Sequence, residues 1–362
     1  MEYYAQSFDT ISELILRHSP SGFEHDVDEL IARRFRELGV PFTIDAAGNL
    51  IGHIKGSGPG SIAITAHKDE IGATVTHVED NGRLKIQNLG GSFPWVYGEG
   101  IVDILGDHQT ISGVLCFGSR HVSHASPQFE FKDVAPLRWK DVWIETKLSR
   151  EQLDHAGVRP GARMVVGKHR KQPYRLNDHI AGYTLDNKAS LAILIELAAR
   201  IHSPIPDVFL VATAKEEVGG IGVLHFVRHH SVDALVALEI APIAPEYPIL
   251  TGADPVLVVE DSYGIYDDPL NRELRKSAAA VGVSLQLAVL NGFGSDGSIA
   301  MKSGGVARAA CLGFPTENTH GFEIAHLGAL RNMTNILVAL CDGNGISKLA
   351  VENVGQEGTK HG

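Results

Sequence analysis

Five short segments place histidine or carboxylate side chains in or beside apolar, strand-like runs. They are AHKDE at 66–70, TLDNK at 184–188, AKEEVGG at 214–220, ALEIAP at 237–242 and ENTHGFE at 317–323. In open α/β sheets, ligands bind beyond the carboxyl ends of the strands, so polar residues there are candidates for binding and catalysis. Imidazole nitrogens and carboxylate oxygens are common ligands of divalent cations. Together the segments indicate a metal site assembled from distant parts of the chain.

Two of the segments contain side chains that can act as a pair. In the H-x-D sequence, His67 and Asp69 lie on the same side of an extended chain. The imidazole can then bind a metal while the carboxylate accepts its other N–H. Glu216 and Glu217 are adjacent acids after the apolar run FLVATA. One of them could coordinate a cation while the other transfers a proton.

Three further residues are ambiguous when each is taken alone. Asp186 precedes an apolar helix, where a carboxylate can cap the helix or bridge two cations. Glu239 lies in the apolar run VALEIA, where a buried charge needs either a cation or an arginine as partner. His320 lies in a glycine-flanked turn, which is typical of an ordinary surface histidine.

The segments between these residues alternate between helix-like and strand-like patterns. Apolar residues recur at helical spacing in 24–38 and 188–201. Strand-like runs are SIAITAH at 61–67, DVFLVATA at 207–214, DALVALEIA at 233–241 and VARAACL at 306–312. This alternation predicts an α/β fold with a mixed, mostly parallel sheet between layers of helices.

Residues 73–172 differ from the rest of the chain. They contain short β-like runs such as ATVTHV, RLKIQNL and ARMVVG, which are separated by Gly, Pro and Asn turns. We therefore expect an inserted β-rich domain at 73–172. The catalytic α/β domain is then discontinuous and comprises residues 1–72 and 173–362.

Composition excludes several classes of protein. The 362 residues carry a net charge of -11, and Lys and Arg are scattered, which argues against a nucleic-acid partner. The N-terminal segment lacks the pattern of an export signal, and no run of about 18 apolar residues indicates a membrane span. Cys116, Cys311 and Cys341 are far apart and form no CxxC pair, which favours a reducing, cytoplasmic location.

The order of the motifs resembles the tetrahedral aminopeptidases, a glutamyl and deblocking aminopeptidase family of dinuclear metallopeptidases. The stretches that look like that family's motifs are SGFE at 21–24, AHKDEIGATVTHVEDNGRL, LDNKAS, KEEVGGIG and GSDGSIA. They occur in order over nearly the whole chain. The last one contains part of a G-x-G-x-x-G match at 292–297, which lies too far from an opening βαβ unit to indicate a dinucleotide site.

The resemblance implies two divalent metal ions per chain, zinc or cobalt, in a co-catalytic pair. One ion would be bound by His67 and Glu239 and the other by Glu217 and His320, with Asp186 bridging, Asp69 orienting His67, and Glu216 as the general base toward the bridging water. The family often has Asp where this chain has Glu239, and the longer side chain changes reach and metal preference. The inserted domain would be a small β-barrel that forms a homodimer, and such dimers commonly assemble into homododecamers.

The implied activity is metal-dependent removal of N-terminal residues from a peptide or small amide substrate. One alternative is a deacylase or amidase, because EIAPIAP, EDSYGIYDD and THGFE look like a branch linked to acylated glutamine-type dipeptide osmolytes. Another class, a non-catalytic scaffold, is disfavoured because every ligand position is filled. A glycosidase would need two carboxylates at a set spacing, and the histidine ligands argue against it.

Overall fold

A computed structural model describes residues 2–132 and 135–357. The chain divides into two compact units, one of Met1–Asp69 with Pro173–Gly362 and one of Glu70–Gln172. We call them the α/β unit and the barrel unit. No helix in the described part of the chain is both long and apolar enough to cross a membrane.

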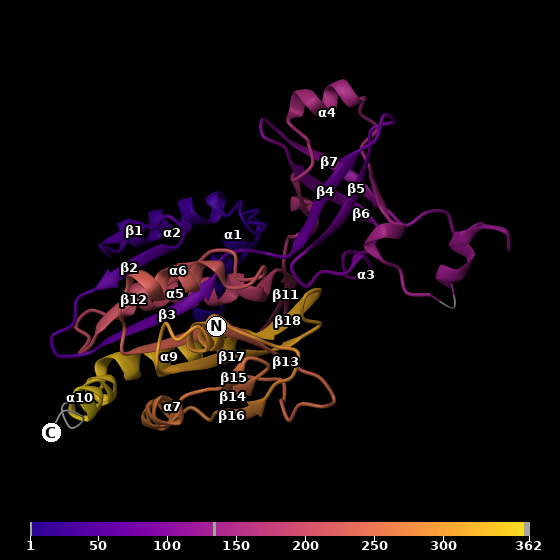
Figure 1. The fold of residues 1–362 in the computed structure, drawn as a ribbon. Helices are drawn as coiled ribbons and strands as arrows, with labels where there is room; N and C mark the ends of the chain where they lie inside the picture. Colours follow the sequence, from indigo (N-terminus) through magenta and orange to yellow (C-terminus); the bar gives the residue numbers. More distant parts are fainter. Residues whose placement is uncertain (1, 133–134, 358–362) are drawn as a thin grey trace. The chain divides into compact units, whose positions relative to one another are not determined.

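The α/β unit is built on a 12-stranded sheet (Figure 1). The main order is β1 (Phe42–Ile44), β2 (Leu50–Ile54), β12 (Asp207–Thr213), β3 (Ser61–His67), β13 (Ala234–Pro242), β17 (Ala309–Glu317), β18 (Phe322–His326), β11 (His179–Tyr183) and β10 (Tyr174–Leu176). Off this path, β14 (Val256–Asp261) pairs with β15 (Gly264–Ile265), β16 (Gln286–Val289) and β17.

Parallel pairing joins the central strands β12, β3, β13 and β17, and also joins β14 to β16. The other pairs of this sheet are antiparallel. The predicted mixed sheet is therefore confirmed, with its parallel core flanked by antiparallel strands. The carboxyl ends of β12, β3, β13 and β17 consequently share one edge of the sheet.

Helices cover both faces of this sheet. One apolar core contains residues of α1 (Glu2–Ile15), α2 (His25–Glu37), α5 (Leu185–Arg200), α7 (Asp268–Ala280), α9 (Leu327–Asp342) and α10 (Gly345–Glu357). The opposite core contains residues of α6 (Ile221–His229) and α8 (Asp296–Lys302). In β3, Ile62 and Ile64 pack into the first core while Ala63 packs into the second. This period of two is the alternation expected for a strand buried on both faces.

The barrel unit is a closed antiparallel barrel. Its strand order is β4 (Gly72–Val78), β5 (Arg83–Leu89), β8 (Trp143–Glu145), β7 (Thr110–Cys116), β6 (Gly100–Leu105) and β9 (Arg163–Val166), which pairs again with β4. Val75, Leu84, Ile104, Ile144 and Met164 are fully buried. Closure removes the free strand edges that would otherwise promote aggregation. The fold predicted for the inserted segment, a small β-barrel, is confirmed.

Candidate metal centre

The candidate residues meet at the edge where the parallel strands end. His67 is the last residue of β3, and Glu239 lies in the neighbouring strand β13. Glu216 and Glu217 follow β12 in a loop, and His320 lies in the turn between β17 and β18. The topology therefore brings residues separated by more than 250 positions to one site, at the place where ligands bind to open α/β sheets.

Asp186 lies between the two histidines. Its Oδ1 is 3.0 Å from His67 Nε2, and its Oδ2 is 3.4 Å from His320 Nε2. Glu239 Oε1 is 3.9 Å from His67 Nε2, and Glu217 Oε1 is 4.0 Å from His320 Nε2. In each of the two resulting triads, which share Asp186, the ligand atoms lie within 4.8 Å of one another. This donor set fits two divalent cations bridged by one carboxylate.

The start of α5 directs Asp186 toward this position. Thr184 has a left-handed φ of 63°, and Asp186 and Asn187 have non-helical backbone angles. The Asn187 side chain donates a hydrogen bond of 2.7 Å to the carbonyl of Leu238, the residue before Glu239. The regular helix therefore begins after Asn187, and the Asp186 carboxylate faces the two histidines.

Asp69 contacts more of the site than the H-x-D pattern indicated. His67 Nδ1 is 3.1 Å from the backbone carbonyl oxygen of Asp69 and 3.5 Å from the side-chain Oδ1 of Asp69. The same carboxylate accepts hydrogen bonds from the backbone N–H groups of Glu216 (2.9 Å) and Glu217 (3.2 Å) and from the hydroxyl of Ser21 (2.6 Å). Asp69 thus fixes the loop that carries both acids, in addition to the imidazole of His67.

Glu323 is a positioning residue that sequence reasoning missed. It is 1% exposed, and its two carboxylate oxygens accept the backbone N–H groups of Asp186 and His320, each at 3.0 Å. One side chain therefore ties together ligands that come from α5 and from the turn after β17. The run GFEIA, an acid among apolar residues in a strand, carries the same signal as Glu239.

Buried negative charge dominates the electrostatics of the centre. Burial, with repulsion from neighbouring carboxylates, raises the pKa of Glu217 to about 7 and that of Glu323 to about 8. Burial raises the pKa of Glu239 and Glu216 well above the ordinary value. For Asp186, burial is outweighed by hydrogen bonds to His320 and His67, which lower its pKa. Divalent cations would offset this excess of negative charge and displace the retained protons.

The centre opens into a cavity of about 210 Å³. Six of the candidate residues line it: His67, Asp186, Glu216, Glu217, Glu239 and His320. Asp69, which is fully buried, supports them from behind through the contacts described above. A bound molecule can therefore reach the candidate ligands and the candidate base together.

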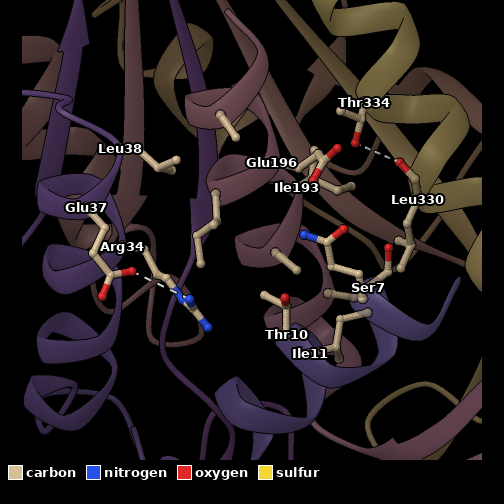
Figure 2. A pocket seen from close by; sticks show the side chains of 15 residues that line it. Ser7, Thr10, Ile11, Arg34, Glu37, Leu38, Ile193, Glu196, Leu330 and Thr334 are labelled. Carbon is tan, nitrogen blue, oxygen red and sulfur yellow. Dashed lines mark hydrogen bonds and ion pairs between the residues drawn. The ribbon is translucent and has the colours of Figure 1, made fainter. Parts of the chain in front are cut away.

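A second hollow, of about 160 Å³, lies among α1, α2, α5 and α9 on the helical face (Figure 2). Figure 2 shows Arg34 directed toward Glu37, and its guanidinium also contacts Glu13. None of the described residues that line this hollow is a histidine or cysteine. Its charged side chains are already in ion pairs, Arg34 with Glu37 and Glu13, and Glu196 with Arg200.

The fold and the site together define a hydrolase of the metallopeptidase class. Residues 48–336 match the model of the M42 glutamyl aminopeptidase family, so the chain belongs to that family. It is a metal-dependent aminopeptidase that requires divalent cations.

The chain is also similar to individual proteins in sequence or in fold. The lysyl aminopeptidase of Pyrococcus furiosus is 27% identical over 59% of this chain and 60% of its own length. The solved structure of aminopeptidase APDkam598 from Desulfurococcus kamchatkensis is similar over 96% of this chain and 98% of that one, with 24% identity and a TM-score of 0.85. The TET1 peptidase of Pyrococcus horikoshii is similar over 92% and 99%, with 24% identity and a TM-score of 0.82.

Glu323→Gln tests the role of this carboxylate in positioning the site. Glutamine keeps the volume but leaves one acceptor oxygen for two N–H donors, so Asp186 and His320 lose a common support. We expect zinc affinity of the metal-free protein, measured by calorimetric titration, to fall about 10- to 100-fold. Glu246→Gln, at an exposed carboxylate, is the matched control. Unchanged affinity in Glu323→Gln, with the melting temperature also unchanged, would show that Glu323 does not position the ligands.

Proposed function

We propose that the protein releases N-terminal residues from peptides with two divalent cations held at the strand-end centre. His67 and Glu239 hold one cation, Glu217 and His320 hold the other, and Asp186 bridges them. The observation that supports this arrangement is the pair of triads that share Asp186, which presents a different oxygen to each histidine. A single-metal hydrolase site commonly has three ligands and an open position, whereas five ligands divide naturally around two ions.

Zinc and cobalt fit the donor set best. Each ion would receive one imidazole nitrogen, and the remaining donors are carboxylate oxygens, a combination that suits borderline cations more than magnesium or calcium. Glu239 reaches the site from within strand β13 and is 4% exposed, so a bound cation would compensate a buried charge there.

Each side chain has a defined part in peptide hydrolysis. When bound, the cations acidify the attacking water and polarise the scissile carbonyl. Glu216 takes the proton from that water as the C–O bond forms, and it returns a proton to the amine that leaves as the C–N bond breaks. The Asp69 carboxylate, bonded to the N–H groups of Glu216 and Glu217, holds the base and the neighbouring ligand in a fixed relation.

We further propose that the barrel unit mediates assembly into a homodimer or a larger shell. Phe93 and Trp95 in this unit are stacked on each other although 55% and 62% exposed, which is unusual for large aromatic side chains. The Pyrococcus horikoshii TET1 peptidase can assemble into a tetrahedron or a large octahedral shell.

Light scattering of the purified protein tests the assembly. We expect at least a dimer at micromolar concentration. Trp95→Asp should shift the population toward smaller species, because it places a charge in the apolar contact, whereas Trp143→Phe is a control within the same unit. A fully active monomer in the wild-type protein would contradict the proposal.

Substitutions of the adjacent acids test the catalytic assignment, because loss of Glu216 and loss of Glu217 should have different effects on turnover and metal content. Glu216→Gln removes the base and keeps the volume, so we expect turnover to fall by about 10² to 10⁴ while two metal ions per chain are retained. Glu217→Gln removes a charged ligand, so one ion should be lost or weakened, and activity should partly recover in excess metal.

Metal content by elemental analysis, paired with turnover of an aminoacyl substrate, decides between the two roles. The opposite pattern, with metal lost in Glu216→Gln and retained in Glu217→Gln, would exchange the two roles. Normal turnover in both variants would place the chemistry elsewhere.

A further inference from the structure

The cavity beside the candidate centre has two chemically different walls. One wall consists of the six candidate ligands and base described above. Every other described residue that lines the cavity is aliphatic, aromatic or glycine, and Tyr263, Phe293 and Ile299 supply the side chains of this wall. A substrate whose scissile bond lies at the centre must therefore place a neighbouring group against an uncharged, apolar wall.

Two loops form the aromatic part of this wall, and hydrogen bonds tie them together. The hydroxyl of Ser262 accepts the backbone N–H of Gly292 at 2.7 Å and that of Phe293 at 3.3 Å, while Ser262 N–H donates to the Phe293 carbonyl at 3.1 Å. The N–H of Tyr263 donates to Asp261 Oδ1 at 2.8 Å. The wall is thus a fixed part of the fold and is suited to discriminate between side chains.

The ring of Tyr263 packs directly against the backbone of Gly294. A Cβ atom at position 294 would lie only 2.2 Å from the ring's Cε2 atom. Glycine at this position therefore permits the ring to lie where it borders the cavity. The same glycine belongs to the G-x-G-x-x-G match, so this part of the pattern serves close packing around the cavity.

The volume of the cavity and the lack of charge on this wall limit which substrate side chains can bind here. An apolar cavity of about 150 Å³ in another protein holds one benzene molecule, so 210 Å³ accommodates one side chain together with the reacting atoms. A charged side chain here would lose its hydration without gaining a partner from the apolar wall. Lys302, whose Nζ is 4.8 Å from the centre of the Tyr263 ring, is exposed and does not line the cavity.

We propose that this wall is the binding site for the N-terminal side chain of the substrate, and that it selects uncharged apolar residues such as leucine and phenylalanine. The inference rests on the proposed function and adds its substrate class. Acidic and basic N-terminal residues are excluded, although the family is named for glutamyl aminopeptidases and the Pyrococcus furiosus relative is a lysyl aminopeptidase. Tyr263, Phe293 and Ile299 determine the specificity.

A panel of aminoacyl p-nitroanilides measures this preference on the metal-loaded protein. We expect kcat/KM for Leu and Phe to exceed that for Glu and Lys by at least about 100-fold, the usual consequence of burying a charge without a partner. Ala should be hydrolysed roughly 10-fold more slowly than Leu, because it fills less of the wall. N-acetyl-Leu p-nitroanilide in the same panel reports whether a free amine is required.

Three variants test whether the apolar wall sets the preference. Tyr263→Arg places a cation at a half-exposed position on the wall, and it should raise kcat/KM for Glu relative to Leu by at least about 10-fold. Phe293→Ala should lower kcat/KM for Leu and Phe while two metal ions stay bound, with a thermal melt to check that the fold persists. Lys302→Met, outside the cavity, should leave the order of preference unchanged.

The possible outcomes distinguish this inference from the proposed function. Hydrolysis that favours Glu or Lys in the wild-type protein would overturn the apolar pocket while leaving the aminopeptidase mechanism intact. A Glu preference that disappears in Lys302→Met would assign specificity to that lysine. If N-acetyl-Leu p-nitroanilide were the only substrate hydrolysed, or if no substrate in the panel were hydrolysed, both the proposed function and this pocket would be contradicted.

Discussion

One carboxylate between two imidazoles is the constraint on which the rest of the site depends. Asp186 must present separate oxygens to His67 and His320. His67 ends β3 on one side of β13, and His320 lies in the turn after β17, on the other side of β13. The surroundings hold it there: Glu323 accepts the Asp186 N–H, and Asn187 bonds to the backbone of β13. Left-handed backbone at Thr184 and His320 costs about 1 to 3 kcal/mol at each residue, and the surrounding fold must supply that energy.

The same arrangement concentrates negative charge in a poorly hydrated place. Asp69, Asp186, Glu239 and Glu323 are buried, and the two imidazoles cannot neutralise them together with Glu216 and Glu217. Burying several ionised carboxylates together costs free energy when no cation is bound, and the raised pKa values of Glu217 and Glu323 reflect that cost. Because cations bind only where the fold assembles these ligands, metal binding also stabilises the folded chain.

Much of the architecture could be predicted from the sequence because it rests on local patterns. Apolar runs indicated the strands that carry His67 and Glu239. The change after residue 72 to short β-like runs separated by turns indicated the inserted β-rich segment. The seven candidate residues came from the motifs and from the family resemblance. The structure brings all seven to one place.

Other features depend on tertiary contacts that no local pattern encodes. The hydrogen bonds from Glu323 to two separate elements follow from the pairing of β18 with β17 and β11, which no sequence pattern predicted. Asp69 was expected to orient His67, yet its carboxylate also holds a loop almost 150 residues away. The helix-cap alternative for Asp186 could be weighed only with the backbone angles of α5 known. The apolar wall joins Tyr263 to a glycine run whose sequence pattern is better known from nucleotide sites.

The most direct test of the central claim is anomalous X-ray diffraction from crystals of the zinc-loaded protein. We expect two peaks per chain, about 3.5 to 4 Å apart, on either side of the Asp186 carboxylate. His67 and Glu239 should lie nearest one peak, and Glu217 and His320 nearest the other. A single peak at full zinc occupancy, or a pair of peaks that Asp186 does not bridge, would contradict a two-metal centre bridged by Asp186.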